Sequence, residues 1–436
     1  MKKVISVLLS AVMILSCMSV IALAKDEIDY TIVNPYECVD WDTWDNYKAC
    51  LHLHTTASDG DVELYDMLKE YYDHDYDILA VTDHGVINNG WNMEKKTNGI
   101  FNGFRKVEPL TEEQYNYFVN GEDRDGRGMI DITGGIECNM AVVSKTHVNG
   151  YFTTYGQGVW GKENDYKTAT VEIEKAGGYS VINHPGDWVN SNNFPERSSE
   201  DWYISYFADI FTTSKTCLGM EICNNTDNCT RSDKILWDNL LRVVIPTGRN
   251  IWAFADDDSE YIDEVGRSFE MFVLPENTVE NVENAMVNGN FFACCKYLKT
   301  PTRQDEFDGD GNVPLVSNII VNQEENTITV VPDESRNCQS IQWIANGNVI
   351  STDYTIDLND YEDLLGCYVR FQLRGTGGMT YSQAFELKYE GRVDDEIPEM
   401  ETSTPFGNIP SFYYHSIWYS LLALIIEKLA DWTGII

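Results

Sequence analysis

Two histidines one residue apart give the first indication of chemistry in this sequence. His52 and His54 flank Leu53 in a short apolar run, and side chains alternate along a strand, so both imidazoles point to the same side. That spacing suits two ligands to one metal ion. His84 directly follows a second apolar run, residues 78–82, and is a third candidate ligand.

Two further polar residues end apolar runs in the same way. Glu137 follows Gly-Gly-Ile at 134–136, and His184 follows Val-Ile-Asn at 181–183. Ligating groups that recur at the ends of strands indicate one rim of an α/β fold, where the active sites of barrels lie. Imidazole together with carboxylate suits zinc, manganese or iron.

Short strand-like runs alternate with amphipathic helical stretches in the part of the chain that holds these residues. The expected strands lie at 49–54, 77–82, 130–138, 179–183, 219–223 and 251–255, and the expected helices at 62–72, 169–176 and 235–243. This alternation is typical of a mainly parallel sheet, either a barrel or a doubly wound sheet. About eight β units over about 250 residues favour the barrel.

Two segments between these elements resemble insertions. Residues 86–128 are rich in Asn, Gly and charge, and residues 187–215 are rich in Ser, Asn and aromatic residues. Each follows the end of an expected strand, so both are candidate active-site loops.

The C-terminal part has a different texture. Residues 313–390 contain alternating strands at 317–321, 327–331, 341–345, 368–373 and 384–387, separated by Gly and Asn turns. This pattern predicts a small antiparallel β-sandwich that folds independently. Residues 391–411 are an acidic, Pro-containing linker, and 412–436 form an amphipathic helix. The apolar run of this helix is too short to span a membrane. We therefore expect the helix to dock on a membrane surface or on a partner.

The N-terminus predicts export. Lys2 and Lys3 precede an apolar run that ends in the A-x-A site at 22–24, which is the order of a Sec signal peptide spanning residues 1–24. A membrane anchor, or a lipoprotein cleavage box ending at Cys17, would explain the same run. In each case we expect a secreted or extracellular protein. Residues 25–47 are an acidic, aromatic lead-in.

The net charge and the cysteine content bear on the partners of this protein and on its disulfides. The formal net charge is −39, from 70 acidic and 31 basic residues, and such a surface repels nucleic acid and anionic lipid. We therefore expect no nucleic acid as a surface partner. The sequence contains 11 cysteines. Those in the exported chain could equally form disulfides or stay as buried free thiols.

Residues 48–300 resemble the PHP (polymerase and histidinol phosphatase) superfamily of metal-dependent phosphoesterases. The resemblance is carried by six ordered motifs. They are His52-Leu53-His54 with Ser58-Asp59-Gly60, then Thr82-Asp83-His84-Gly85, Gly135-Ile136-Glu137, His147, Asn183-His184-Pro185-Gly186, and Gly219-Met220-Glu221-Ile222-Cys223-Asn224. The order of the six is more specific than any one of them.

The resemblance implies a fold and a set of ligands. The fold is a distorted (β/α)7 TIM-like barrel that binds two or three divalent ions (Mn, Zn or Fe), followed here by the β-sandwich. It implies a first ion on His52, His54, Glu137 and a late aspartate; a second on Glu137, His147 and His184; and a third on Asp59, His84 and the residue two after that aspartate. Glu137 and Asp83 are the implied catalytic pair, with Asp83 orienting a ligand histidine or the strand end.

The late motif departs from the family pattern, which usually ends Asp-x-His. No histidine lies near 255–260, so the preferred alignment uses Asp258 and Glu260, and the rival one uses Asp256 and Asp258. A carboxylate in place of imidazole would favour manganese, magnesium or iron(II) over zinc at that position.

The resemblance implies a hydrolase of small or polymeric phosphoesters that uses water activated by two or three metal ions, and the N-terminal segment predicts that this hydrolase is secreted. The alternative is a non-catalytic extracellular binding or assembly protein on the same scaffold. Retention of nearly all the ligands favours the enzyme.

Overall fold

The computed structural model describes residues 28–95, 107–138, 145–156, 165–303 and 306–399. The expected signal peptide, the lipoprotein position Cys17 and the C-terminal helix lie outside these residues. Within them, no helix is long and apolar enough to cross a membrane.

The first sheet carries the first histidine pair. Its core is three short parallel strands in the order β2 (Asp45–Cys50), β3 (Ile78–Leu79) and β4 (Ile130–Asp131). On the other side of β2, the strands β10 (Ser268–Leu274) and β11 (Phe291–Cys295) continue the sheet in antiparallel fashion. His52 and His54 follow directly where β2 ends.

The second sheet has the order β5 (Ile136–Cys138), β6 (Val148–Tyr151), β7 (Tyr179–Ile182), β8 (Cys217–Asn224) and β9 (Trp252–Asp256). The pairs β7–β8 and β8–β9 are parallel, whereas β5–β6 and β6–β7 are antiparallel. The sheet is therefore more mixed than the mainly parallel arrangement expected from the sequence.

Isolated bridges join the two sheets, among them the bridge between Leu53 and Ser259 and the bridge between His84 and Glu137. The His54 amide donates to the Ser259 carbonyl at 2.9 Å, and the Glu137 amide donates to Thr82 at 3.1 Å. The fold is thus mixed α/β, and the named strands of the described residues form no continuous closed barrel.

Gly135 makes the second bridge possible. A Cβ on this residue would lie 2.4 Å from the Val81 carbonyl oxygen, closer than any side chain tolerates. Glycine therefore allows the chain before Glu137 to approach the end of β3.

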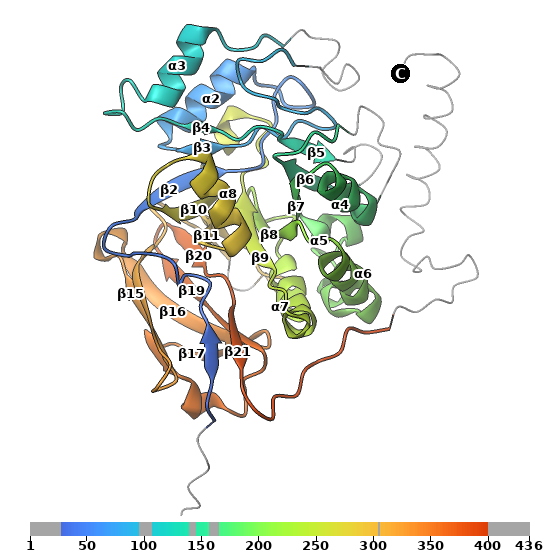
Figure 1. The fold of residues 1–436 in the computed structure, drawn as a ribbon, viewed down its shortest axis with the longest axis vertical. Helices are drawn as coiled ribbons and strands as arrows, with labels where there is room; N and C mark the ends of the chain where they lie inside the picture. Colours follow the sequence, from blue (N-terminus) through green and yellow to red (C-terminus); the bar gives the residue numbers. More distant parts are fainter. Residues whose placement is uncertain (1–27, 96–106, 139–144, 157–164, 304–305, 400–436) are drawn as a thin grey trace, which may run out of the picture.

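Helices cover the outer faces of both sheets (Figure 1). They are α2 (Leu64–Asp73), α3 (Glu112–Asn120), α4 (Tyr166–Lys175), α5 (Pro185–Val189), α6 (Asp201–Thr213), α7 (Asp233–Val244) and α8 (Val279–Asn288). Short 3₁₀ turns are η1 (Pro195–Ser199), η2 (Ile245–Thr247), η3 (Ile262–Glu264), η4 (Glu334–Arg336) and η5 (Leu358–Tyr361).

Both segments expected as inserted loops contain helices. In 86–128, α3 begins with a capping box in which the Thr111 hydroxyl accepts from the Gln114 amide and the Gln114 side chain accepts from Thr111. These reciprocal bonds satisfy amides that would otherwise lack partners at the helix start. In 187–215, α6 buries an apolar face that includes Phe207 and Phe211.

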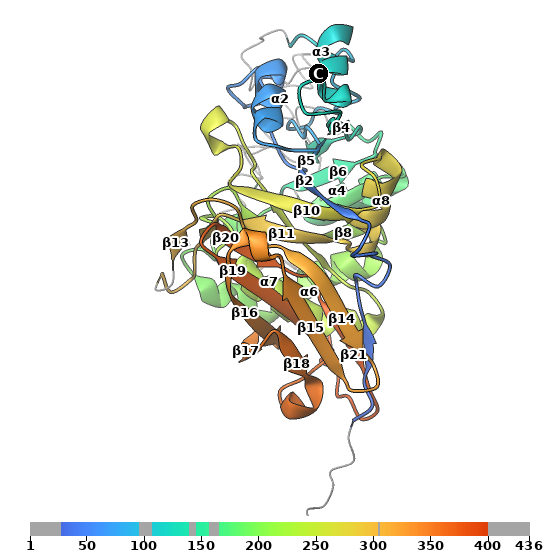
Figure 2. The ribbon, with the colours of Figure 1, turned by 90° about the vertical axis from the view of Figure 1, so that its left-hand side faces the viewer.

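The C-terminal strands form two layers (Figure 2). One contains β14 (Val316–Asn322), β15 (Thr327–Pro332) and β18 (Thr355–Asp357); the other contains β16 (Cys338–Ala345), β17 (Asn348–Ser351), β19 (Tyr368–Gly375), β20 (Gly378–Tyr381) and β21 (Phe385–Lys388). Ile319 and Val330 of the first layer share a core with Trp343 and Phe371 of the second. A separate pair, β12 (Tyr297–Leu298) and β13 (Phe307–Asp308), lies in the connection.

The second layer is continuous with the first sheet, because β20 pairs with β11. The lead-in also joins it, since β1 (Thr31–Val33) pairs with β21. The expected C-terminal strands are present, but hydrogen bonds cross the expected boundary between 300 and 313. That boundary and the independent folding of 313–390 stay predictions. The ten cysteines that the structure describes are all free.

A buried ion pair fastens the C-terminal layer to α7. Arg370 of β19 donates from Nε and Nη2 to the two carboxylate oxygens of Asp238, both at 2.7 Å. The Tyr368 hydroxyl donates to the same carboxylate at 2.8 Å. The guanidinium also lies 4.7 Å from the Trp237 ring centroid.

We predict that Asp238→Ala destabilises the protein by about 3–5 kcal/mol, because it leaves a buried guanidinium without its counter-charge. The measurement is urea unfolding followed by tryptophan fluorescence. Asp209→Ala, which removes the partner of Lys167 in an exposed pair, is the control and should change stability far less. Equal effects of the two substitutions would mean that the buried pair does not fasten the layers.

Candidate metal centre

Glu137 is the side chain on which the histidines converge. It extends from β5, is 1% exposed and is surrounded by five imidazoles. Oε1 lies 3.2 Å from His52 Nε2, 3.1 Å from His147 Nδ1 and 3.7 Å from His184 Nε2, and Oε2 lies 3.3 Å from His54 Nε2 and 3.0 Å from His84 Nδ1. The Asn183 amide donates to Oε1 at 2.7 Å. The five histidines singled out by the sequence therefore meet at one carboxylate.

Asp258 approaches the first histidine pair from the other sheet. Its Oδ1 lies 3.0 Å from Nε2 of both His52 and His54, and those two nitrogens are 3.1 Å apart. Asp258 lies two residues beyond β9 with φ of 46°, and its amide donates to the His52 carbonyl at 2.9 Å. This left-handed turn directs the carboxylate back toward the histidines.

Asp256, the rival position, lies elsewhere. It ends β9, is fully buried, and its carboxylate accepts from the Leu51 amide. Burial and the neighbouring Glu221 raise its pKa to about 7. Its carboxylate belongs to none of the His/Asp/Glu clusters among the described residues.

Asp59 and His84 lie together, with Asp59 Oδ2 3.3 Å from His84 Nε2 and Asp59 Oδ1 3.6 Å from His54 Nδ1. Glu260 is near this pair but outside the clusters of the described residues. Burial, together with the charge of Asp59, raises the pKa of Glu260 to about 7.

Three groups of side chains have ligand atoms close enough to hold metal ions. They are His52, His54 and Asp258; His54, His84 and Glu137; and Glu137, His147 and His184. Because neighbouring groups share His54 or Glu137, the arrangement suits several ions side by side. The donor set is imidazole and carboxylate, which transition metals accept.

The electrostatics of the cluster also call for added positive charge. Burial lowers the pKa of His52 and His54, but the carboxylates around them, with Asp258 prominent, raise both well above the ordinary range. His84 is raised to about 10 and His184 to about 9 for the same reason. Burial raises the pKa of Glu137, and the histidines outweigh it and hold that pKa well below normal. Cations bound here would replace the protons that these imidazoles attract.

Glu221, to which sequence reasoning assigned no role, positions two of the histidines. From the middle of β8, its Oε1 lies 2.6 Å from His52 Nδ1, and its Oε2 accepts from the His184 amide at 2.8 Å. The Asn224 amide links Glu221 Oε2 to Asp258 Oδ2, at 3.0 Å each. A carboxylate on the far nitrogen of a ligand histidine fixes the ring and its tautomer. The sequence signals were an acidic residue inside an apolar strand and its place in the sixth of the PHP-like motifs.

Asp83 holds the turn after β2. Its carboxylate accepts from the Thr55 amide at 2.8 Å, the Thr55 hydroxyl at 3.0 Å and the Ser58 hydroxyl at 3.0 Å. The ammonium of Lys95, which is buried, lies 3.7 Å away. Asp83 therefore positions the segment between His54 and Asp59.

No protein-family model and no curated protein matches the sequence. Solved structures similar to the chain include a two-domain protein from Bacteroides vulgatus that contains a predicted PHP-like metal-dependent phosphoesterase. The identity is 14%, over 84% of this chain and 91% of that one, with a TM-score of 0.41. A lesion-specific endonuclease from Pyrococcus furiosus has 15% identity over 56% of each chain and a TM-score of 0.32.

An amidohydrolase from Chromobacterium violaceum has 13% identity, over 49% of this chain and 87% of that one, with a TM-score of 0.30. At such low TM-scores these likenesses are distant, so the functional assignment rests on the side chains of the metal centre.

We predict that Glu221→Gln weakens metal binding by about 10- to 100-fold. Glutamine keeps only one acceptor oxygen, so its NH2 group would face either the His184 and Asn224 amides, which are donors already, or Nδ1 of His52. The measurement is competition for the bound metal with a chelator of known affinity. Glu280→Gln, the same change on the exposed face of α8, should leave metal affinity unchanged. Equal affinities of all three proteins would show that Glu221 does not orient the ligands.

The metal-free protein should lose stability as pH rises. The pKa of His84 is about 10 in the folded chain against an ordinary 6.5, so its favourable charge interactions are complete below about pH 6.5 and disappear toward pH 10. Urea unfolding in a chelator between pH 6.5 and 9 should show this decline, and His84→Asn should reduce its slope. Metal should reverse the trend, because protons compete with it for imidazole. An unchanged slope in His84→Asn would contradict this assignment.

Proposed function

We propose that this protein is a metal-dependent phosphoester hydrolase in which two or three divalent ions activate water. The observation that supports this most is the burial of Glu137 among five imidazoles, with Asp258 and Asp59 at the edges of the same cluster. The ordered PHP-like motifs supply these side chains and support the choice of a phosphoester as the substrate.

Each proposed ion has a core of contacting side chains. His52, His54 and Asp258 would hold the first, with Glu137 beside them; Glu137, His147 and His184 would hold the second. A third would lie at His84 and Asp59, and Glu260 would complete it from its nearby position. We propose manganese, zinc or iron, because the donors are imidazole and carboxylate.

The chain's own groups would fix the geometry of the reaction. When bound, divalent ions acidify water and neutralise negative charge on a phosphoryl group. Glu137 would be a ligand in more than one of these groups, since its two oxygens face different histidines. Glu221 would keep His52 in one orientation, and Asp83 would hold the turn that carries Asp59. Such fixed side chains reduce the reorganisation that hydrolysis requires.

We also propose that the strands around the site form a distorted barrel. The bridges between the sheets extend the order into a ring of β2, β3, β5, β6, β7, β8 and β9. The two C-terminal layers would form the appended sandwich. The N-terminal segment supports export, so we propose that hydrolysis takes place outside the cytoplasm.

We predict that the exported chain, purified with manganese or zinc, hydrolyses p-nitrophenyl phosphate or its diester and loses this activity when chelated. Glu137→Ala and His52→Ala should each lower the rate by at least about 100-fold, because a metal ligand contributes more than the residues that orient it. Bound metal per chain is measured on the same samples. A chain that binds metal and retains its fold but hydrolyses none of the tested phosphoesters would favour the binding-protein alternative.

Asp258→Asn and Asp256→Asn form a matched pair, since the residues are two positions apart and carry the same side chain. The first should lose metal and activity and the second should retain both. Glu260→Gln tests the third ion by the metal content per chain. Retention by Asp258→Asn together with loss by Asp256→Asn would favour the rival alignment.

A further inference from the structure

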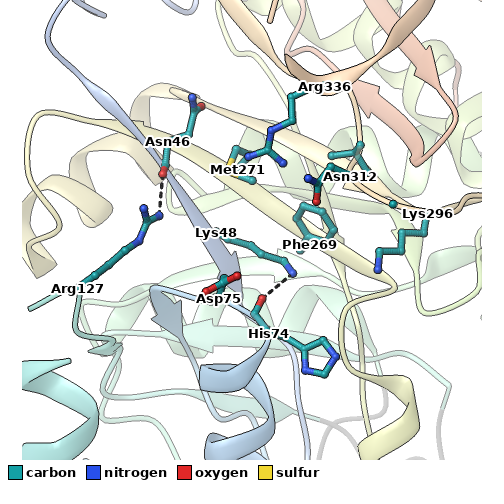
Figure 3. Close-up of a pocket in the computed structure, with 12 residues that line it drawn as sticks. Asn46, Lys48, His74, Asp75, Arg127, Phe269, Met271, Lys296, Asn312 and Arg336 are labelled. Carbon is teal, nitrogen blue, oxygen red and sulfur yellow. Dashed lines mark hydrogen bonds between the residues drawn. The ribbon is translucent and has the colours of Figure 1, made fainter. Parts of the chain in front are cut away.

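A polar cavity of about 420 Å³ lies where the start of β2 meets β10 and the segment before β14. None of the residues that line it belongs to the metal centre. Its basic side chains come from separate parts of the chain, namely Lys48, Arg127, Lys296 and Arg336. Figure 3 shows Lys48 and Lys296 directed toward one another, with Arg336 above them.

The charge of this cavity is opposite to that of the chain. With 70 acidic against 31 basic residues, four basic side chains around one cavity run against the overall composition, and the one lining carboxylate is Asp75. Arg127 is already engaged by Asp77, at 2.6 Å from Nε. The nearest carboxylate to Arg336 is Asp333, 3.9 Å from its Nε. Lys48, Lys296 and Arg336 are therefore the basic side chains of this cavity that can act on a ligand.

Lys48 and Lys296 have no carboxylate within ion-pair distance among the described residues. The Lys48 ammonium donates to the His74 carbonyl at 3.1 Å and lies 3.9 Å from the Tyr76 ring centroid and 4.5 Å from that of Phe269. An ammonium has three hydrogens to donate, so two stay available. Burial lowers the pKa of Lys48 to about 8, and the charge of Lys296 acts in the same direction, while the carboxylates of Asp257 and Asp75 partly oppose them. A bound anion would relieve both effects.

The rest of the cavity fits the uncharged part of a ligand. Phe269 and Met271 line it with apolar surface, and Asn46 lines it with a buried amide oxygen that has no donor among the described residues. A ligand hydroxyl can supply that donor. The volume also exceeds the needs of a single inorganic ion.

We propose that this cavity is a non-catalytic binding site for a small phosphorylated sugar. Its phosphate would accept hydrogen bonds from Lys48, Lys296 and Arg336, since charge-assisted bonds to phosphate are the strong ones. A sugar hydroxyl would donate to Asn46, and the ring would lie against Phe269. The site is independent of the proposed hydrolysis.

The test uses the exported full-length chain with ¹³C-methyl methionine, because Met271 is the methionine among the residues that line this cavity. Glucose 6-phosphate should shift the Met271 signal in a saturable way, and glucose should not. Lys296→Gln and Arg336→Gln should each weaken this binding about tenfold without changing phosphoester hydrolysis. Asn46→Ala should weaken glucose 6-phosphate more than inorganic phosphate.

Lys175→Gln, an exposed lysine on α4, is the matched control and should bind as the parent does. The proposal is overturned if the Met271 signal does not respond, or if both cavity variants bind as tightly as the control. Malonate binding as tightly as glucose 6-phosphate would also overturn it, because a dicarboxylate would then satisfy the cavity. Inactive protein that still shifts Met271 would refute the hydrolase and leave this site standing.

Discussion

The structure depends on one electrostatic constraint, the burial of Glu137 against five imidazoles. A carboxylate in a poorly solvated interior needs nearby positive charge, and the chain meets this need with histidines from segments next to several strands. Those histidines in turn bring Asp258 and Asp59 close, so each group stabilises a charge state of the next. Without ions, protons on the imidazoles offset the negative charge of the carboxylates. Bound ions would offset the same charge by coordination. The same few side chains therefore govern both the local stability and the chemistry.

The backbone is arranged to meet this constraint at a seam between two sheets. The bridges at Leu53–Ser259 and at His84–Glu137 lie beside the ligands themselves, and Gly135 permits the close approach that the second one needs. The contacts that join the two sheets therefore also place the metal ligands next to one another. Away from the site, the Asp238–Arg370 pair connects α7 to the C-terminal layer that contains β19, which supplies no ligands. The site is held from within by polar contacts and from outside by packing.

Local patterns made much of this predictable. His52 and His54 stand out by alternation, and His84 and Glu137 by their place after apolar runs; α2 and the strands of 313–390 follow from periodicity. Glu221 acquired no role because its partner is 169 residues away, and no local pattern records such a pairing. The antiparallel β5–β6–β7 order was missed for a similar reason, since strand direction depends on the path of the connections. Asp258 was preferred over Asp256 by alignment, whereas its contacts arise from a left-handed turn.

The pairing of β1 with β21 has a consequence for how the chain acquires its fold. Thr31 lies opposite Lys388, so the residues of β1 are synthesised long before the residues of β21 with which they pair. Contacts between residues so far apart slow folding, because a long loop must close before they form. Until then the edge of β21 presents unpaired amides and carbonyls, which invite pairing with other chains. Completion of this edge would mark the point at which the newly made protein becomes safe from self-association.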